Sequence, residues 1–188
     1  MADTRNVHIP LGSGLIYYKE FSGSIPEDAA IETEANQLGK IEGGAQIEYK
    51  STFKTFKDDL GTISRTELTE EAATLKASLI AWTMADMEVY AATARVDTKT
   101  KTGHRIIKIG GLSNNTGKSY IFRFVHKDSK YGDVRVSIVG KQSDGFTLDY
   151  KVDDAGKMEL NVQAEAMDSE GTLVMYDETL PTTTSSGS

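Results

Sequence analysis

The chain has 188 residues, 38% of them hydrophobic, and its 17 glycines against three prolines indicate a β-rich domain with many turns. It has no cysteine, which excludes disulfides and thiolate metal sites, and its apolar stretches are far shorter than the roughly 20 residues of a membrane helix. The net charge of −7 is unevenly divided, because residues 99–141 are net +8 whereas residues 1–98 and 142–188 are net −7 and −8.

The first half of the chain predicts an arm followed by short strands. Residues 1–14 are polar and punctuated by Gly and Pro, which is typical of an extended N-terminal arm. Residues 15–18 predict a short strand. Residues 46–53 alternate, with Tyr49 on the apolar side and Glu48 on the polar side, and predict a second strand.

A charged connection follows this strand. Residues 54–67 contain the turn sequence DDLG, and we expect a long exposed loop over about residues 50–68. Residues 69–93 are rich in helix formers, yet Leu75 and Leu79 also fit an alternating strand. Thr83 followed by Asp86 resembles a capping box. We therefore predict a strand near residues 70–82 and a helix near residues 84–93.

The second half of the chain predicts a series of strands separated by turn-rich segments. The expected strands are Arg105–Ile109, Ser119–His126, Val134–Gly140, Phe146–Val152 and Met158–Ala166. The last alternates most cleanly, with Leu160 and Val162 on the apolar face and Glu159 and Glu165 on the polar face. Residues 179–188 are of low complexity and predict a flexible tail.

Motifs for catalysis or for cofactor binding are weak in this sequence. The segment GLSNNTGKS resembles a phosphate-binding loop, but its glycines enclose five residues, and a strand follows instead of a helix. Histidines 8, 104 and 126 have no second ligand at metal-binding spacing. The carboxylates form no pattern typical of an acid/base pair. We therefore expect neither an enzyme nor a cofactor or metal site.

The basic block over residues 99–141 has two interpretations. Lys118–Lys127 interleaves cationic and aromatic residues, as single-strand nucleic-acid binders do. Tyr120, Phe122 and Phe124 share one parity, however, which is typical of a buried strand face. The acidic and basic blocks are either solvated faces or complementary surfaces through which copies dock. A nucleic-acid-binding module and a secreted carbohydrate-binding adhesin remain alternatives, although no apolar leader opens the chain and we expect synthesis in the cytoplasm.

Four groups of segments carry a resemblance to a known family. They are LGSGLIYYKEFSGSIPED with LGKIEGGAQIEYK; KDDLGTISRTELTEEAATLKASLIAW; GHRIIKIGGLSNNTGKSYIFRFVHKD with GDVRVSIVGKQSDGFTLDYKVD; and AEAMDSEGTLVMYDE. In their order and spacing, over roughly residues 10–178, the chain resembles the tail tube proteins of long, non-contractile bacteriophage tails. A more distant likeness is to contractile inner tubes and type VI secretion tubes.

The resemblance implies a mainly β fold, a β-sandwich or barrel-like domain over residues 15–178 with one short helix and extended arms. It implies hexameric rings that stack into a hollow tube in the virion, assembled after synthesis in the host cytoplasm. The implied partners are further copies of the chain, the tape-measure protein, the tail terminator and the distal tail proteins. DNA would pass through the tube without sequence-specific binding, and no membrane insertion is implied.

Within this framework we assign three sets of residues as hypotheses. The polar strand faces that would line the lumen carry Glu48, Glu159 and Glu165. Contacts between subunits or rings would involve Lys54, Lys57, Asp58, Asp59, Arg65, Lys99, Lys101 and Arg105. The expected core contains Tyr49, Leu75, Leu79, Trp82, Phe122, Phe124, Leu160 and Val162.

Overall fold

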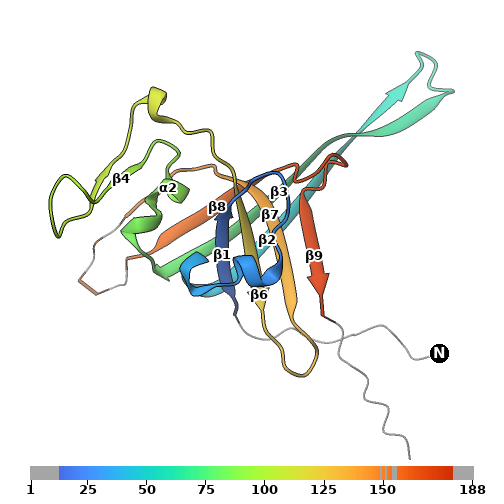
Figure 1. Ribbon diagram of the computed structural model, residues 1–188. Coiled ribbons are helices and arrows are strands. Elements are labelled where there is room, and N and C mark those ends of the chain that lie inside the picture. Colours follow the sequence, from blue (N-terminus) through green and yellow to red (C-terminus); the bar gives the residue numbers. More distant parts are fainter. Residues whose placement is uncertain (1–12, 149, 151, 154–155, 180–188) are drawn as a thin grey trace, which may run out of the picture.

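The computed structural model describes residues 13–148, 150, 152–153 and 156–179, and it is mainly β, as expected (Figure 1). Most of the predicted N-terminal extension, residues 1–14, and of the predicted C-terminal tail, residues 179–188, therefore lies outside the described residues. The strands are β1 (Leu15–Glu20), β2 (Gln37–Lys57), β3 (Ser64–Ala81), β4 (Arg95–Asp97), β5 (Ile106–Lys108), β6 (Tyr120–His126), β7 (Val134–Gln142), β8 (Met158–Glu165) and β9 (Val174–Glu178). The helical segments are α1 (Asp28–Ile31), η1 (Glu34–Asn36), η2 (Met84–Asp86), α2 (Met87–Tyr90) and η3 (Leu112–Asn114).

The main sheet closes on itself. Its order is β6-β1-β2-β3-β8-β7-β9, and β6 also pairs with β7, so that β1, β2, β3, β8, β7 and β6 form a closed antiparallel ring. Strand β9 pairs with the half of β7 that β8 leaves free. Strands β4 and β5 form a separate small sheet at one end of the molecule (Figure 1). Closure satisfies the backbone groups that an open sheet would leave at its edges.

The core fills the inside of this ring. Alternate residues of β3 and β8 point inward, and the register pairs Leu75 with Val162 and Ala77 with Leu160. These side chains, with Leu79 and Phe122, are buried as predicted. Each large aliphatic side chain buried in this way stabilises the fold by about 1.5–3 kcal/mol relative to exposure.

A second apolar cluster lies on the outer face of β1, β6 and β7. Tyr17, Ile121, Val125 and Val139 pack there under the α1 segment, which contributes Ile31. Strand β6 is consequently buried on both faces, which the shared parity of its aromatic residues does not reveal.

Buried charge secures the α1 segment over this cluster. The Arg123 side chain is 2% exposed, donates to Asp28 Oδ1 at 2.5 Å and to Ser137 Oγ at 3.0 Å, and lies 3.6 Å from Glu32. Arg135 donates to Glu32 Oε1 at 2.6 Å. The two arginines thus hold both carboxylates of the segment against the ring, because a buried guanidinium requires such partners.

Four sequence predictions about local structure need correction. Tyr49 is not in the core, because it lies beyond the ring and is 55% exposed. The expected loop over residues 50–68 is a two-stranded ribbon with its turn at residues 58–63. The helix near residues 84–93 ends at Tyr90. Phe146–Val152 forms no strand over its described residues, because no neighbouring strand pairs with it.

Other predictions agree with the structure closely or in part. The expected strand near residues 70–82 lies within β3 apart from its last residue, and five other expected strands match β1, β5, β6, β7 and β8 within a few residues. The expected strand 46–53 is only the middle of β2, which begins nine residues earlier and ends four residues later. Thr83 caps the helical segment by accepting a hydrogen bond from the Ala85 amide at 3.2 Å. Trp82 and Phe124 are only half-buried, although both pack against the inner cluster.

Candidate assembly surfaces

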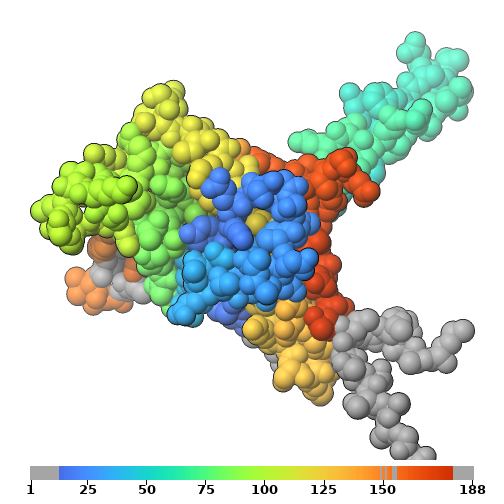
Figure 2. Space-filling view, in the orientation of Figure 1, coloured from blue at the N-terminus to red at the C-terminus, as the bar shows by residue number. Residues whose placement is uncertain are grey.

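A long β-ribbon projects from the ring, and we call residues 49–73 the arm (Figures 1 and 2). Strand β8 pairs with β3 only over Thr74–Leu79, and β1 pairs with β2 only at Gln37 and Gly39. Within the described part of the chain, the two strands of the arm therefore pair only with each other. Their outer edges present unpaired backbone groups, which in other proteins template strand addition or association.

The turn at the tip of the arm is held by one carboxylate. Asp58 Oδ1 accepts a hydrogen bond from the Ile63 amide at 2.8 Å, and Oδ2 accepts one from the Thr62 hydroxyl at 2.6 Å. The Ile63 amide, followed by the Thr62 hydroxyl, lowers the pKa of Asp58. Gly61, with φ of +68°, supplies the positive φ that the turn requires. Asp58 therefore shapes the tip.

The arm is two-sided. Its register places Tyr49, Phe53 and Leu68 on the face that continues the inner face of the ring, together with Thr55 and Thr66, whose hydroxyls lie 2.9 Å apart. Phe53 is 62% and Leu68 is 45% exposed. We call this the inner face of the arm.

The opposite, outer face of the arm carries most of its charge. It contains Lys50, Lys54, Phe56, Arg65, Glu67 and Glu70. Arg65 and Glu67 form an ion pair, and the Lys54 ammonium lies 5.2 Å from the centre of the Phe56 ring. An exposed ribbon with one apolar and one charged face has the pattern of a surface that another molecule covers.

A second projection lies away from the arm, on the left in Figure 1, and we call residues 95–117 the finger. It consists of β4, β5 and the loop around η3, and it exposes the cations Arg95, Lys99, Lys101, Arg105 and Lys108. Asp97 accepts hydrogen bonds from Thr100 and from the Lys99 amide, with the Thr100 hydroxyl as the largest cause, and these lower its pKa to about 2. The finger is thus a basic surface in which Asp97 orders the start of the turn after β4.

The structure divides the predicted contact residues between these projections. Lys54, Lys57, Asp58, Asp59 and Arg65 lie on the arm, whereas Lys99, Lys101 and Arg105 lie on the finger. All of these residues are exposed. The sequence assigns Leu68 and Leu112 no role, because an apolar residue in a charged or turn-rich segment has no periodic neighbour to mark it. Phe53 belongs to the apolar side of the predicted strand 46–53, but alternation does not show that this side is exposed.

The predicted lumen residues lie on the outer wall of the ring formed by β2, β3, β8 and β7. Glu48 lies 2.8 Å from Lys50 and 3.3 Å from Lys76, and these two lysines lower its pKa. Glu165 accepts a hydrogen bond from Ser119 at 2.5 Å and lies 3.0 Å from Lys141. The Ser119 hydroxyl, followed by Lys141, lowers the pKa of Glu165. Alternation predicted the face correctly but not these counter-ions.

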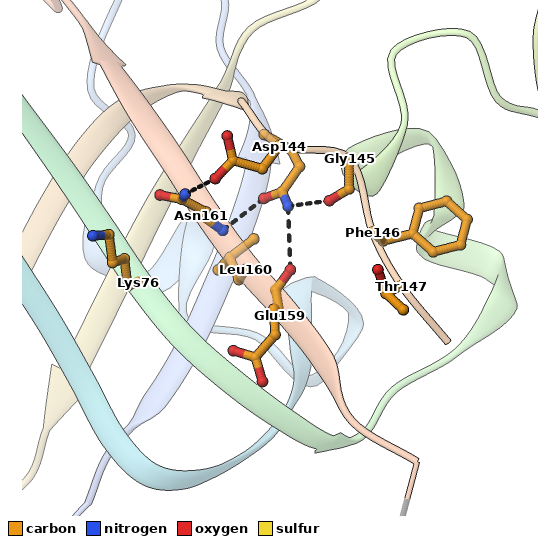
Figure 3. Close-up of a pocket in the computed structure, with 9 residues that line it drawn as sticks. Lys76, Asp144, Gly145, Phe146, Thr147, Glu159, Leu160 and Asn161 are labelled. Carbon is orange, nitrogen blue, oxygen red and sulfur yellow. Dashed lines mark hydrogen bonds between the residues drawn. The ribbon is translucent and has the colours of Figure 1, made fainter. Parts of the chain in front are cut away.

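Glu159 also lies on this wall, beside a shallow pocket. Its carboxylate accepts a hydrogen bond from Ser78 at 2.7 Å, which joins β8 to β3. The pocket has a volume of about 380 Å³ and is lined by Lys76, Asp144, Phe146, Glu159 and Asn161, among others (Figure 3).

The rim of this pocket is a loop that the barrel wall holds in place. Gln142 Nε2 donates to the carbonyls of Gly145 and Glu159, and its Oε1 accepts from the Asn161 amide at 2.7 Å. Asn161 also donates to Asp144. The polar groups around the pocket thus bond mainly to each other, so the pocket is a structural junction in the wall.

Strand β6 does not provide the exposed aromatic and cationic surface that the nucleic-acid interpretation requires. Tyr120, Phe122, Arg123 and His126 are buried, so they form no exposed stacking surface. The exposed cations of the basic block lie mainly on the finger. Among the described residues, no group of three or more His, Asp or Glu side chains could hold a metal ion.

The chain has neither a membrane-spanning helix among its described residues nor a significant match to known proteins. Over the described residues, no helix has the length and apolar character needed to cross a membrane. No model of a known protein family matches the sequence, and no curated protein matches it significantly.

Proposed function

We propose that the chain is a structural protein whose copies assemble into a hollow tube, the tail tube of a long-tailed bacteriophage, and that it is not an enzyme. The observation that carries this proposal is the arm, a ribbon with two unpaired edges and an apolar inner face held in water. Exposed edges and apolar faces of this size are a liability that natural proteins cover by association. The sequence resemblance to tail tube proteins points to the same role.

The closed ring refines how such copies would join. A sandwich with open edges would pair edge to edge along its whole sheet, but here β6–β7 pairing closes the ring within one chain. Among the described strands of the main sheet, the short β9 keeps one open edge because it pairs only with β7. The arm retains unpaired backbone groups on both of its strands. We therefore infer that the arm, more than the ring, makes the contacts between copies.

The polar wall is suited to line a conduit for DNA. DNA carries about one negative charge per 1.7 Å of its axis, so free cations on a lumen wall would retain it. On this wall Lys76 and Lys141 each bind a glutamate, and Lys157 lies 2.6 Å from Glu42. Cations that are already paired have less capacity to bind phosphates, which favours sliding. The net charge of −7 suggests a strongly acidic lumen that repels DNA. The ion pairs on this wall suggest instead a lumen whose charges are paired and which therefore holds DNA weakly.

Under this proposal the protein is made in the host cytoplasm and resides in the virion. Its partners are other copies of itself and, at the tube ends and in the lumen, the tail terminator, distal tail and tape-measure proteins. The rival function is nucleic-acid binding through the finger, which its exposed cations favour.

One experiment separates the two functions. Purified full-length protein is concentrated and examined by negative-stain microscopy and sedimentation velocity, beside a variant in which a short turn replaces residues 51–68. The full chain should form rings or tubes, whereas the shortened variant should remain monomeric. It should still unfold cooperatively, with a circular dichroism signal lowered only by the loss of the ribbon, because these residues contribute nothing to either core cluster.

Two results would overturn the proposal. The first is a full chain that stays monomeric at the highest concentration. The second is assembly that persists in the shortened variant. Binding of a short labelled single strand by the unassembled chain at physiological salt would favour the rival function instead.

A further inference from the structure

If the copies assemble as proposed above, the structure indicates which two surfaces meet, and the following inference rests on that proposed function. We propose that the inner face of the arm binds the loop 109–117 of the next copy, so that copies join head to tail. The loop lies on the finger, and the finger and the arm project in different directions from the ring (Figures 1 and 2). A contact between two different surfaces of identical copies can repeat without limit, as a tube requires.

The inner face of the arm has a central part without charge. Glu71 at its base is bonded to the Tyr49 hydroxyl, and Lys57 lies at its tip. Between them the register pairs Phe53 with Leu68 and Thr55 with Thr66. An occupant of this face must therefore be apolar or uncharged, because a charge placed there would lose water without gaining a partner.

The loop 109–117 has the matching composition. Its sequence IGGLSNNTG contains no charged residue, and Leu112 at its apex is 95% exposed. Leu112 projects from a loop that is held in shape, since the Asn114 side chain donates to the Gly110 carbonyl at 2.8 Å and the Gly110 amide donates to the Thr93 hydroxyl at 3.2 Å. A leucine on an ordered loop can dock without a large ordering cost.

The finger is basic around the loop, where Arg95 and Lys108 lie beside it, whereas the arm carries charges of both signs. At the base of the arm, Glu71 borders the inner face and Glu70 lies next to it on β3. These two carboxylates are the part of the arm whose charge complements the cations of the finger. The β2 strand of the arm, residues 49–57, extends about 30 Å at about 3.3 Å per residue, long enough to reach a neighbouring copy.

Engineered cysteines test the contact directly, because the natural chain has none. Phe53→Cys and Leu112→Cys are made separately, mixed under conditions in which the wild type assembles, and treated with a mild oxidant. The mixture should give a disulfide-linked dimer, and the double variant should give a ladder of linked chains. The matched control is Glu67→Cys on the outer face, which should not link to Leu112→Cys.

Charged variants test the same contact by complementation. Phe53→Asp and Leu112→Asp should each raise the concentration at which assembly begins by about tenfold or more. Mixed together, they should form a one-to-one complex that does not grow, because one partner keeps its arm and the other keeps its loop. Circular dichroism checks that each exposed substitution leaves the fold intact.

The outcomes are distinguishable. If the wild type forms tubes but the mixed Phe53→Cys and Leu112→Cys variants do not link, or if Phe53→Cys alone forms a linked dimer, this contact is overturned while the proposed function stands. A wild-type chain that never assembles would overturn both.

Discussion

Replacement of Arg123 tests whether buried charge holds the α1 segment on the ring. The guanidinium is 2% exposed and donates to Asp28, Ser137 and the Pro26 carbonyl. We expect Arg123→Ala to destabilise the fold and to loosen the segment over the outer apolar cluster. The matched control is Lys50→Ala, which removes an exposed cation from an ion pair with Glu48 and should change stability by less than about 1 kcal/mol.

The size of the effect follows from the contacts of Arg123. Breaking a fully buried ion pair costs about 3–5 kcal/mol, but Asp28 is half exposed and can regain water, so we expect the lower end, about 3 kcal/mol. Arg123→Met refills the volume with apolar atoms and leaves Glu32 paired with Arg135, so it should cost less than Arg123→Ala. For a chain of this length, about 3 kcal/mol corresponds to a fall in Tm of roughly 6–12 °C.

The assay is urea unfolding followed by circular dichroism, with hydrogen exchange of residues 28–32 as a local measure. Equal losses for the Ala and Met variants would mean that charge, and not filled volume, dominates. A loss under about 1 kcal/mol for Arg123→Ala would refute the reasoning, because the cluster would then contribute little to the fold.

Three further predictions concern the core, the arm and assembly. Leu160→Ala should lower the free energy of unfolding, measured by urea denaturation, by about 2–5 kcal/mol because Leu160 is buried in the ring. Leu68→Ala on the arm should change the same quantity by less than about 0.5 kcal/mol in the unassembled chain. The Asp58 pKa is lowered in the fold, so its stabilising contribution is present above the unfolded pKa of about 3.9 and is lost as pH falls through the lower folded value. The protection of the Ile63 amide, measured as its exchange rate relative to the intrinsic rate at the same pH, should therefore fall in that acidic range, and unchanged protection would exclude this role. Light scattering should show assembly weakening as salt rises toward 1 M, where the Debye length is about 3 Å, and salt-insensitive assembly would contradict a contribution from the finger's cations.

Alternation predicted the parts of the fold in which one strand face is buried. It located β8 and the ring-bound part of β3, and it assigned Leu75 and Leu160 to the core, because burial of one face imposes a period of two on the sequence. The same rule placed Tyr49 in the core, although β2 continues past the ring and carries its inward face into water. Periodicity reports the strand and its sides but not what covers them.

The remaining differences have similar physical causes. The sequence predicts a loop for the arm because charged residues and a turn signal dominate it. The pairing of the arm depends on a register that spans the whole hairpin, which no single segment reveals. The pairing of Lys76 with Glu48 depends on neighbouring strands, so a single strand could not reveal it. The assignment of Glu48, Glu159 and Glu165 to one wall followed from alternation alone; their place in a lumen stays a prediction.

Closure of the ring within one chain has a consequence for timing. Because β6 and β7 complete the hydrogen bonding of the ring without help from a second molecule, folding is a unimolecular event whose rate does not depend on protein concentration. Polymerisation, in contrast, would be governed by mass action. A cell could therefore accumulate finished subunits in advance, and the start of tube growth would be decided by supply and nucleation.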